Sequence, residues 1–143
     1  MHARQQIRDA AIQAVTGLAL TGGRVFAGRI YPLQDEELPG ICIYVNDENS
    51  SLISRTTIAR QLSLNIEIYV KSNGDFDAML DDIAGDVEIA TAINYALNAL
   101  VKDIHIKSVQ KDLMKDGEKS IGIAVMSFHC EYQTPQNNPN IIK

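Results

Sequence analysis

The strongest constraint on the fold is a strict alternation of apolar and polar residues between positions 62 and 71. Successive side chains of a β-strand point to opposite faces, so this period of two predicts a strand with one face on a hydrophobic core and the other toward solvent. The apolar positions are Leu62, Leu64, Ile66, Ile68 and Val70, and the polar positions are Ser63, Asn65, Glu67, Tyr69 and Lys71.

Other segments complete an α+β pattern. Helical spacing of apolar residues predicts helices over 3–19, ended by the glycines at 22 and 23, and over 76–101, capped by Asp75. Strands are expected at 24–31, 41–45, 104–114 and 120–133. This order predicts a mainly antiparallel sheet of about five to six strands with two helices packed on one face. The apolar stripe expected on the second helix is Phe76, Leu80, Ile83, Val87, Ala90, Ile93, Leu97 and Leu100.

A chain of 143 residues is long enough for one domain with its own core. We expect this single domain to span residues 1–133. Residues 134–140 are polar and include two prolines, which predicts a flexible C-terminal tail over 134–143.

Composition narrows the classes of function. The formal net charge of -5 argues against a protein that binds phosphate backbones. The sequence has no apolar run of the roughly 18–20 residues needed to span a membrane, and its first residues lack the apolar core of a secretory signal. Cys42 and Cys130 lie in apolar strand patterns without C-x-x-C spacing, which predicts two buried reduced thiols and a cytoplasmic protein.

Residues 46–60 form a polar interruption between predicted strands, with Asp47 and Glu48 at one end and Arg55 and Arg60 at the other. The segment is too polar for a core and too long for a tight hairpin. It is interpreted either as a mobile loop or as an arm that orders against a neighbouring subunit through its opposite charges.

The densest group of carboxylates lies at the start of the second helix, at Asp77, Asp81, Asp82 and Asp86. Pairs four residues apart lie on neighbouring turns and could hold a divalent cation. A solvated helix face is the plainer interpretation, because negative charge is stable near a helix N-terminus. The three histidines, His2, His105 and His129, show no metal-binding spacing, and no catalytic site is visible.

The segment from Thr21 to Tyr44 adds a resemblance. Its residues 23–26 read G-R-V-F, an acidic stretch follows, and 38–39 read L-P. In order and residue type this segment resembles the tail terminator (minor tail protein U) family of long-tailed bacteriophages and prophages. The other matching positions are Arg29, Pro32, Ile41, Ile43 and Tyr44.

This resemblance implies a structural protein that works without catalysis or a cofactor. Such proteins form hexameric rings that cap the end of a completed tail tube, stop its polymerisation and present the surface to which the head is joined. The implied partners are further copies of the chain, the tail tube protein and a head-completion or connector protein. DNA would pass through the pore without specific binding, and the protein would occur in the host cytoplasm during assembly and then in the virion tail.

Candidate interface residues come from the charged and aromatic positions of this chain, because arginines without a basic field more often pair with protein surfaces than bind nucleic acid. They are Arg24, Arg29, Tyr31, Arg55 and Arg60, with acidic partners among Asp35, Glu36, Asp47 and Glu48. Two alternatives stay open. One is another ring-forming neck protein, and the other is a small metal-dependent enzyme that uses Asp81, Asp82 and Asp86.

Overall fold

The computed structural model describes residues 1–28, 33–71, 73–116 and 119–143. Helices and strands alternate in groups along the chain. The elements are α1 (Ala3–Val15), β1 (Val25–Ala27), the 3-10 helix η1 (Asp35–Glu37), β2 (Gly40–Leu52), β3 (Thr57–Lys71), α2 (Phe76–Ile93), α3 (Tyr95–Leu100), β4 (Asp103–Asp116) and β5 (Lys119–Pro135).

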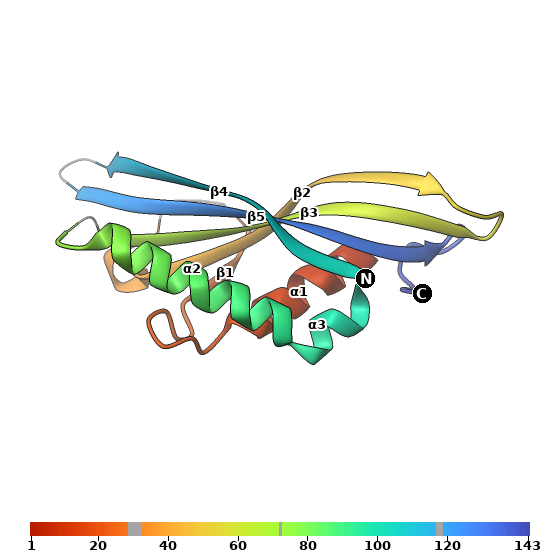
Figure 1. The fold of residues 1–143 in the computed structure, drawn as a ribbon, viewed down its shortest axis with the longest axis horizontal. Coiled ribbons are helices and arrows are strands. Elements are labelled where there is room, and N and C mark those ends of the chain that lie inside the picture. Colours follow the sequence, from red (N-terminus) through yellow and green to blue (C-terminus); the bar gives the residue numbers. More distant parts are fainter. Residues whose placement is uncertain (29–32, 72, 117–118) are drawn as a thin grey trace.

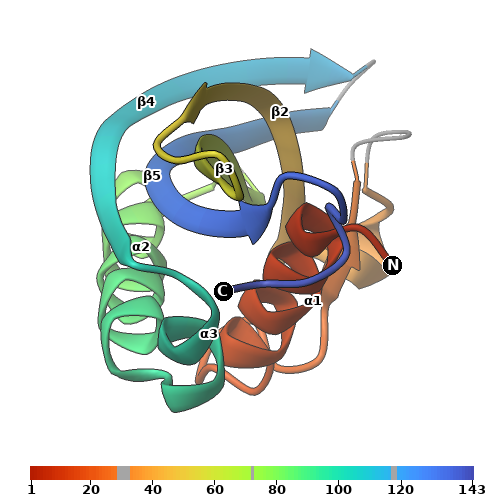
Figure 2. The ribbon, with the colours of Figure 1, turned by 90° about the vertical axis from the view of Figure 1, so that its right-hand side faces the viewer.

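The described strands form one sheet in the order β1-β2-β3-β5-β4. β1 is parallel to β2, and the other neighbouring pairs are antiparallel. The α-helices lie on one side of this sheet, which is strongly curved (Figures 1 and 2). The predicted α+β fold with a mainly antiparallel sheet is confirmed.

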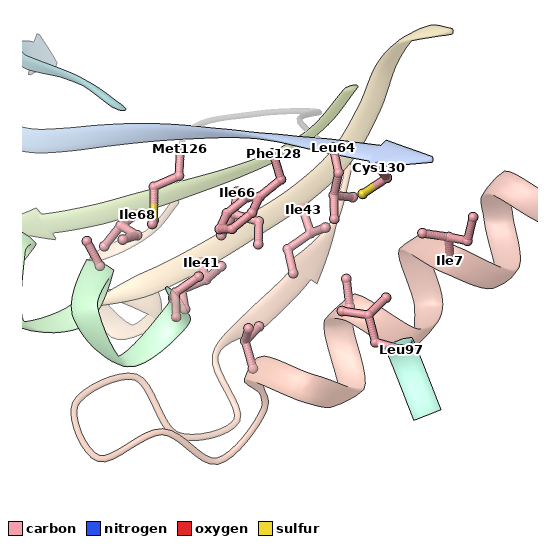
Figure 3. Packing of buried hydrophobic residues seen from close by; sticks show 14 of the residues in the cluster. Ile7, Ile41, Ile43, Leu64, Ile66, Ile68, Leu97, Met126, Phe128 and Cys130 are labelled. Atoms are coloured by element: carbon pink, nitrogen blue, oxygen red, sulfur yellow. The ribbon is translucent and has the colours of Figure 1, made fainter. Parts of the chain in front are cut away.

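The main core fills the space between helices and sheet. In α1 the buried residues are Ala3, Ile7, Ala11 and Val15, a spacing of four that keeps one helix face on the sheet. Side chains from α1, α3 and the sheet meet in this layer (Figure 3). The labelled members are Ile7, Ile41, Ile43, Leu64, Ile66, Ile68, Leu97, Met126, Phe128 and Cys130.

The predicted helix over 76–101 is two helices that meet at Asn94. Asn94 has ψ 115°, outside the helical range, and so ends α2 and begins α3. Its side-chain oxygen accepts a hydrogen bond from the Leu97 backbone N–H at 2.9 Å. The apolar spacing over 76–101 showed no interruption at this break, because Leu97 of α3 packs in the same core as α2.

The predicted C-terminal end of the first helix is also wrong, whereas the second helix begins at residue 76 as predicted. α1 ends at Val15, and Gly17 with φ +94° provides the left-handed turn that the sequence analysis placed at the glycines of 22 and 23. Asp75 occupies the N-cap position of α2, but its side chain makes no capping hydrogen bond. The Asp75 carbonyl oxygen accepts the first backbone hydrogen bond of α2, from Met79 N–H at 3.0 Å.

The polar face of β3 is also buried, contrary to the expected half-buried strand. Glu67 is only 1% exposed, because β2 and β5 flank β3 and their side chains cover it. Tyr44 and Tyr69 donate their hydroxyl protons to its two carboxylate oxygens. Further along, the Asn65 amide bonds to Asn46. A second apolar cluster lies on this face and contains Leu33, Cys42, Tyr69, Ile121 and Ile123.

Both cysteines are buried and free, as predicted. They lie on opposite faces of the sheet, with Cys130 in the main core and Cys42 in the second cluster. Burial, followed by the negative charge of Asp103, raises the pKa of the Cys130 thiol to about 12.

The interpretation of 46–60 as a loop is wrong. β2 continues to Leu52 and β3 begins at Thr57, so only residues 53–56 connect them. A register shift between Val45 and Glu48 lets the ladder continue through the polar stretch. The later residues of β2 are polar and mostly exposed, because the β2–β3 hairpin extends beyond the helices there (Figure 1).

β5 ends at Pro135, two residues beyond the expected domain end at 133. The chain after it folds back on the domain. The carbonyl oxygen of Pro139 accepts a hydrogen bond from Ala3 N–H at 2.9 Å, and Lys143 N–H donates to Gln133 oxygen at 2.9 Å. The flexibility of residues 134–143 stays a prediction.

Gly85 provides a simple test of α2. A methyl group added there would meet no atom within 4 Å. Alanine loses less conformational entropy than glycine in a helix, so Gly85→Ala is expected to stabilise the fold by about 0.5–1 kcal/mol. Chemical denaturation of both proteins checks this, and an unchanged or lower midpoint would contradict an α2 that is helical at this position.

Candidate assembly surfaces

The distal parts of β2 and β3 form a projecting feature, called here the hairpin arm and defined as residues 48–62. Within it, Glu48 pairs with Leu62 and Leu52 pairs with Ile58. β5 lies along the other side of β3, where Pro135 pairs with Thr57. The connecting turn lies at one end of the molecule, beyond the helices (Figure 1).

The base of the arm is fixed by one carboxylate. Glu48 Oε2 accepts hydrogen bonds from Arg4 Nη1 at 2.9 Å and from Arg60 Nη1 at 3.0 Å. The Tyr132 hydroxyl donates to Glu48 Oε1, and Arg60 Nε donates to Thr134 Oγ1 at 3.0 Å. The network thereby connects α1, β2, β3 and β5.

This network is mostly shielded from solvent. The side chains of Glu48 and Arg60 are each 13% exposed, and Tyr132 is buried. Burial, with the hydrogen bond to Glu48 as the second cause, raises the pKa of Tyr132 above its usual range. Glu48 and Arg60, two of the four charged residues of the segment 46–60 that were considered as contacts to a neighbouring subunit, therefore form an ion pair within one protomer.

The tip of the arm is apolar and basic. Leu52 is 59% exposed and Ile53 is 54% exposed, although both belong to residue types that are usually buried. Arg55 is exposed in the same turn and forms no ion pair with the residues that the structure describes. The turn itself is held by hydrogen bonds from Ile53 N–H to Thr57 oxygen and from Gln136 N–H to Thr56 oxygen.

The remaining candidates from the Thr21–Tyr44 segment are spread out. Arg24 donates to the backbone oxygens of Pro39 and Leu20 at 2.8 Å each, so it fixes the local chain. Asp35 and Glu36 are exposed on η1. Arg29 and Tyr31 lie outside the described residues.

The acidic face of α2 is partly neutralised by β4. Lys111 Nζ contacts Asp77 Oδ1 at 3.0 Å and Asp81 Oδ1 at 2.6 Å. Hydrogen bonds to Asp81 and then to Asp77 raise the pKa of Lys111. Within residues 1–28, 33–71, 73–116 and 119–143, no three His, Cys, Asp or Glu side chains are arranged to hold a metal ion.

Two histidines that are far apart in sequence lie next to each other in the sheet. His105 and His129 are direct cross-strand partners, and their ring centroids are 5.1 Å apart. Asp103 Oδ2 lies 2.7 Å from His105 Nδ1, and Glu131 Oε1 lies 3.4 Å from His129 Nε2. The sequence could not indicate this pairing, because it depends on the register between β4 and β5.

The sequence patterns also did not indicate an exposed apolar patch on α2 and α3. Ile89 is 61% exposed, Ile93 is 76% exposed and Tyr95 is 88% exposed. We call these three residues the α2 patch. Ile93 was expected in the core, but it lies on the side of α2 that faces away from the buried Leu80. The available signal was Ile89 four residues before Ile93, on a face separate from the buried Leu80, Ile83 and Val87.

The helix cap at the N-terminus makes a testable contribution to stability. His2 Nδ1 accepts a hydrogen bond from Arg4 N–H at 3.1 Å, which requires the unprotonated nitrogen. Burial, then the charges of Arg4 and Arg60, lower the pKa of His2 below its ordinary 6.5. A lowered histidine pKa means that the unfolded chain binds more protons, so this stabilisation is present above pH 6.5 and is lost as the pH falls below it.

We expect His2→Asn to keep the cap while removing this pH dependence, because asparagine caps helices without titrating. The measurement is the melting temperature of both proteins at about pH 8 and about pH 5.5. The wild type is expected to lose more stability than the variant on acidification. Equal losses in the two proteins would show that His2 does not titrate as described.

These features define a small α+β protein whose exposed apolar and charged side chains suit association with other proteins. The sequence model for phage minor tail protein U matches residues 2–132. The chain therefore belongs to the phage minor tail protein U family, and it is a structural protein of a phage tail.

Other comparisons add less. A chain in the virion of a native gene transfer agent particle aligns with 14% identity, over 93% of this chain and 92% of that chain, with a TM-score of 0.38. No curated protein gives a significant match. None of the helices that the structure describes is long and apolar enough to cross a membrane.

Proposed function

We propose that this protein forms a ring that caps the end of the tail tube, terminates tube polymerisation and forms the surface joined to the head. The observation that carries the proposal is family membership over residues 2–132, nearly the whole chain. Six copies per ring are expected from the same resemblance.

The two edges of the sheet support association between copies of the kind that closes a ring. β4 is the outer strand on one side, and on the other side β1 pairs with β2 only from Ile41 to Ile43. The backbone of the hairpin arm in β2 therefore has no strand partner on that side among the described residues. A contact between one edge of one copy and the other edge of the next copy would be heterologous, and heterologous contacts close into rings when the rotation allows.

The proposed partners are other copies, the tail tube protein and a head-completion or connector protein. Proposed contact residues are the exposed Asp35, Glu36, Asp47 and Arg55, while Glu48, Arg60 and Arg24 act by holding the surfaces in place. The formal net charge of -5 is consistent with a pore through which DNA passes without specific binding.

The test is the native mass of the purified protein by light scattering over a range of concentrations, with negative-stain images of any large species. A closed ring with a central hole is the expected result. A compact two-fold dimer under every condition would contradict the proposal. A ring that binds the portal side of the neck but not the tube end would favour the other neck-protein alternative.

A further inference from the structure

Two exposed apolar features of this chain remain without a partner in the protomer. One is the tip of the hairpin arm, with Leu52 and Ile53, and the other is the α2 patch of Ile89, Ile93 and Tyr95. The arm turn projects at one end of the molecule, whereas the end of α2 lies in the helical layer (Figure 1). One copy therefore cannot cover its own patch with its own tip.

The charges beside these features are opposite in sign. At 100° per residue, Asp82, Asp86, Ile89 and Ile93 fall on one stripe of α2, acidic in its first half and apolar in its second. Neither Asp82 nor Asp86 forms an ion pair with the described residues. Arg55 in the arm turn is likewise without an ion pair in that part of the chain.

We propose that the tip of the hairpin arm of one copy docks on the α2 patch of the next copy, with Ile53 on Ile89 and Ile93 and Arg55 beside Asp86. This inference rests on the proposed ring and names one of its contacts. Tip and patch are different surfaces, so each copy gives one contact and receives one, as a closed heterologous ring requires.

The spacing of the residues is compatible with simultaneous contact. Ile53 and Arg55 are two residues apart in the connecting turn, so their Cα atoms are separated by at most about 7 Å. Asp86 precedes Ile89 by three residues, about 4.5 Å along a helix. The long side chain of arginine easily spans the difference while Ile53 rests on the apolar half of the stripe.

A groove beside the patch gives the tip additional surface. It lies between α2 and β4, has a volume of 210 Å³ and is lined by residues that include Glu88, Ala92, His105 and Phe128.

The contact is small compared with interfaces of about 1,200–2,000 Å² that are stable on their own. A single tip-to-patch contact is therefore expected to be weak. Ring closure makes the last contact intramolecular and strengthens the whole assembly. The inference thus predicts a sharp rise of assembly with protein concentration, with few open intermediates.

The experiment compares Ile53→Asp, Ile93→Asp and their equimolar mixture with the wild type, by light scattering and negative stain. Each variant alone is expected to need roughly 30-fold more protein for half-maximal assembly, as for loss of a central apolar contact. Ile53→Asp keeps an intact patch and Ile93→Asp keeps an intact tip, so at millimolar concentration, where a single weak contact is populated, the mixture should form one-to-one pairs that cannot close. Met79→Asp, at an exposed apolar residue near the other end of α2, is the matched control and should assemble normally.

A charge exchange tests the polar half of the contact. Arg55→Glu and Asp86→Arg should each weaken assembly, and the double variant should recover most of it. Recovery separates a direct contact from an indirect effect on folding, because both residues are exposed or partly exposed and neither holds the fold together.

Rings formed by both aspartate variants at wild-type concentrations would overturn the inference and leave the proposed function intact. The inference would also be overturned if Ile53→Asp formed rings that no longer cap tubes. That result would show that the tip contacts the tube protein instead. A mixture without pairs, or a wild type that stays monomeric at millimolar concentration, would also overturn it. Failure of the proposed function itself is recognised separately, as wild-type protein that does not stop tube growth.

Discussion

Replacing Glu48 with alanine is expected to lower the free energy of unfolding by about 2–4 kcal/mol. The change removes the acceptor for Arg4, Arg60 and the Tyr132 hydroxyl. The Arg60 side chain is only 13% exposed, so its positive charge would stay in the protein without the carboxylate that now neutralises it. Urea denaturation followed by circular dichroism measures the loss.

Asp47→Ala is the matched control, because Asp47 is the adjacent carboxylate and is exposed. Its effect should stay within about 0.5 kcal/mol, as for most surface substitutions. Glu48→Gln keeps the shape and should fall between the two variants. If Glu48→Ala proves as mild as Asp47→Ala, the network at the base of the arm does not carry the stability assigned to it.

Gly40→Ala is expected to destabilise the fold by about 2–3 kcal/mol, because it forces overpacking against backbone. A Cβ atom at Gly40 would overlap the carbonyl oxygen of Glu37 and would lie 2.8 Å from Leu33 Cδ1. A carbonyl oxygen cannot rotate away as a side chain can. The close approach of η1 to the start of β2 therefore requires glycine at this position.

Gly23→Ala provides the comparison, since a Cβ atom there meets nothing within 4 Å. Thermal melts of the two variants should differ by many degrees. A Gly40→Ala protein as stable as Gly23→Ala would contradict the described packing of η1 on β2.

Local periodicity predicted the parts of the fold whose order is set by neighbouring residues. The alternation from Leu62 to Val70 identified β3, and the predicted ends of β4 and β5 lie within two residues of the observed ones. The same logic failed at Asn94, because a helix break with a capping side chain leaves the apolar spacing unchanged. It failed at Glu67 because burial of a polar strand face depends on what β2 and β5 place over it.

The sequence predicted the candidate assembly surfaces less well than it predicted the fold. Glu48 and Arg60 were singled out by their charge, yet their pairing follows from an antiparallel register that includes a bulge after Val45. The meeting of His105 and His129 likewise depends on register. Exposure of Ile93, by contrast, follows from local helical spacing, which places it with Ile89 on the side of α2 away from the buried Leu80. For the Glu48–Arg60 pair and the histidine pair, the deciding fact is a strand register that local periodicity does not determine.

Tube length is the most direct measurement of whether this protein stops the growth of a tail tube, as we propose. Tail tube protein from the same phage would be assembled in vitro with and without the purified protein, and tube lengths would be measured by electron microscopy. The proposal predicts that tubes stop lengthening once the protein is added, with a ring at one end of each tube. Tubes that keep growing at the same rate, with bare ends, would contradict it.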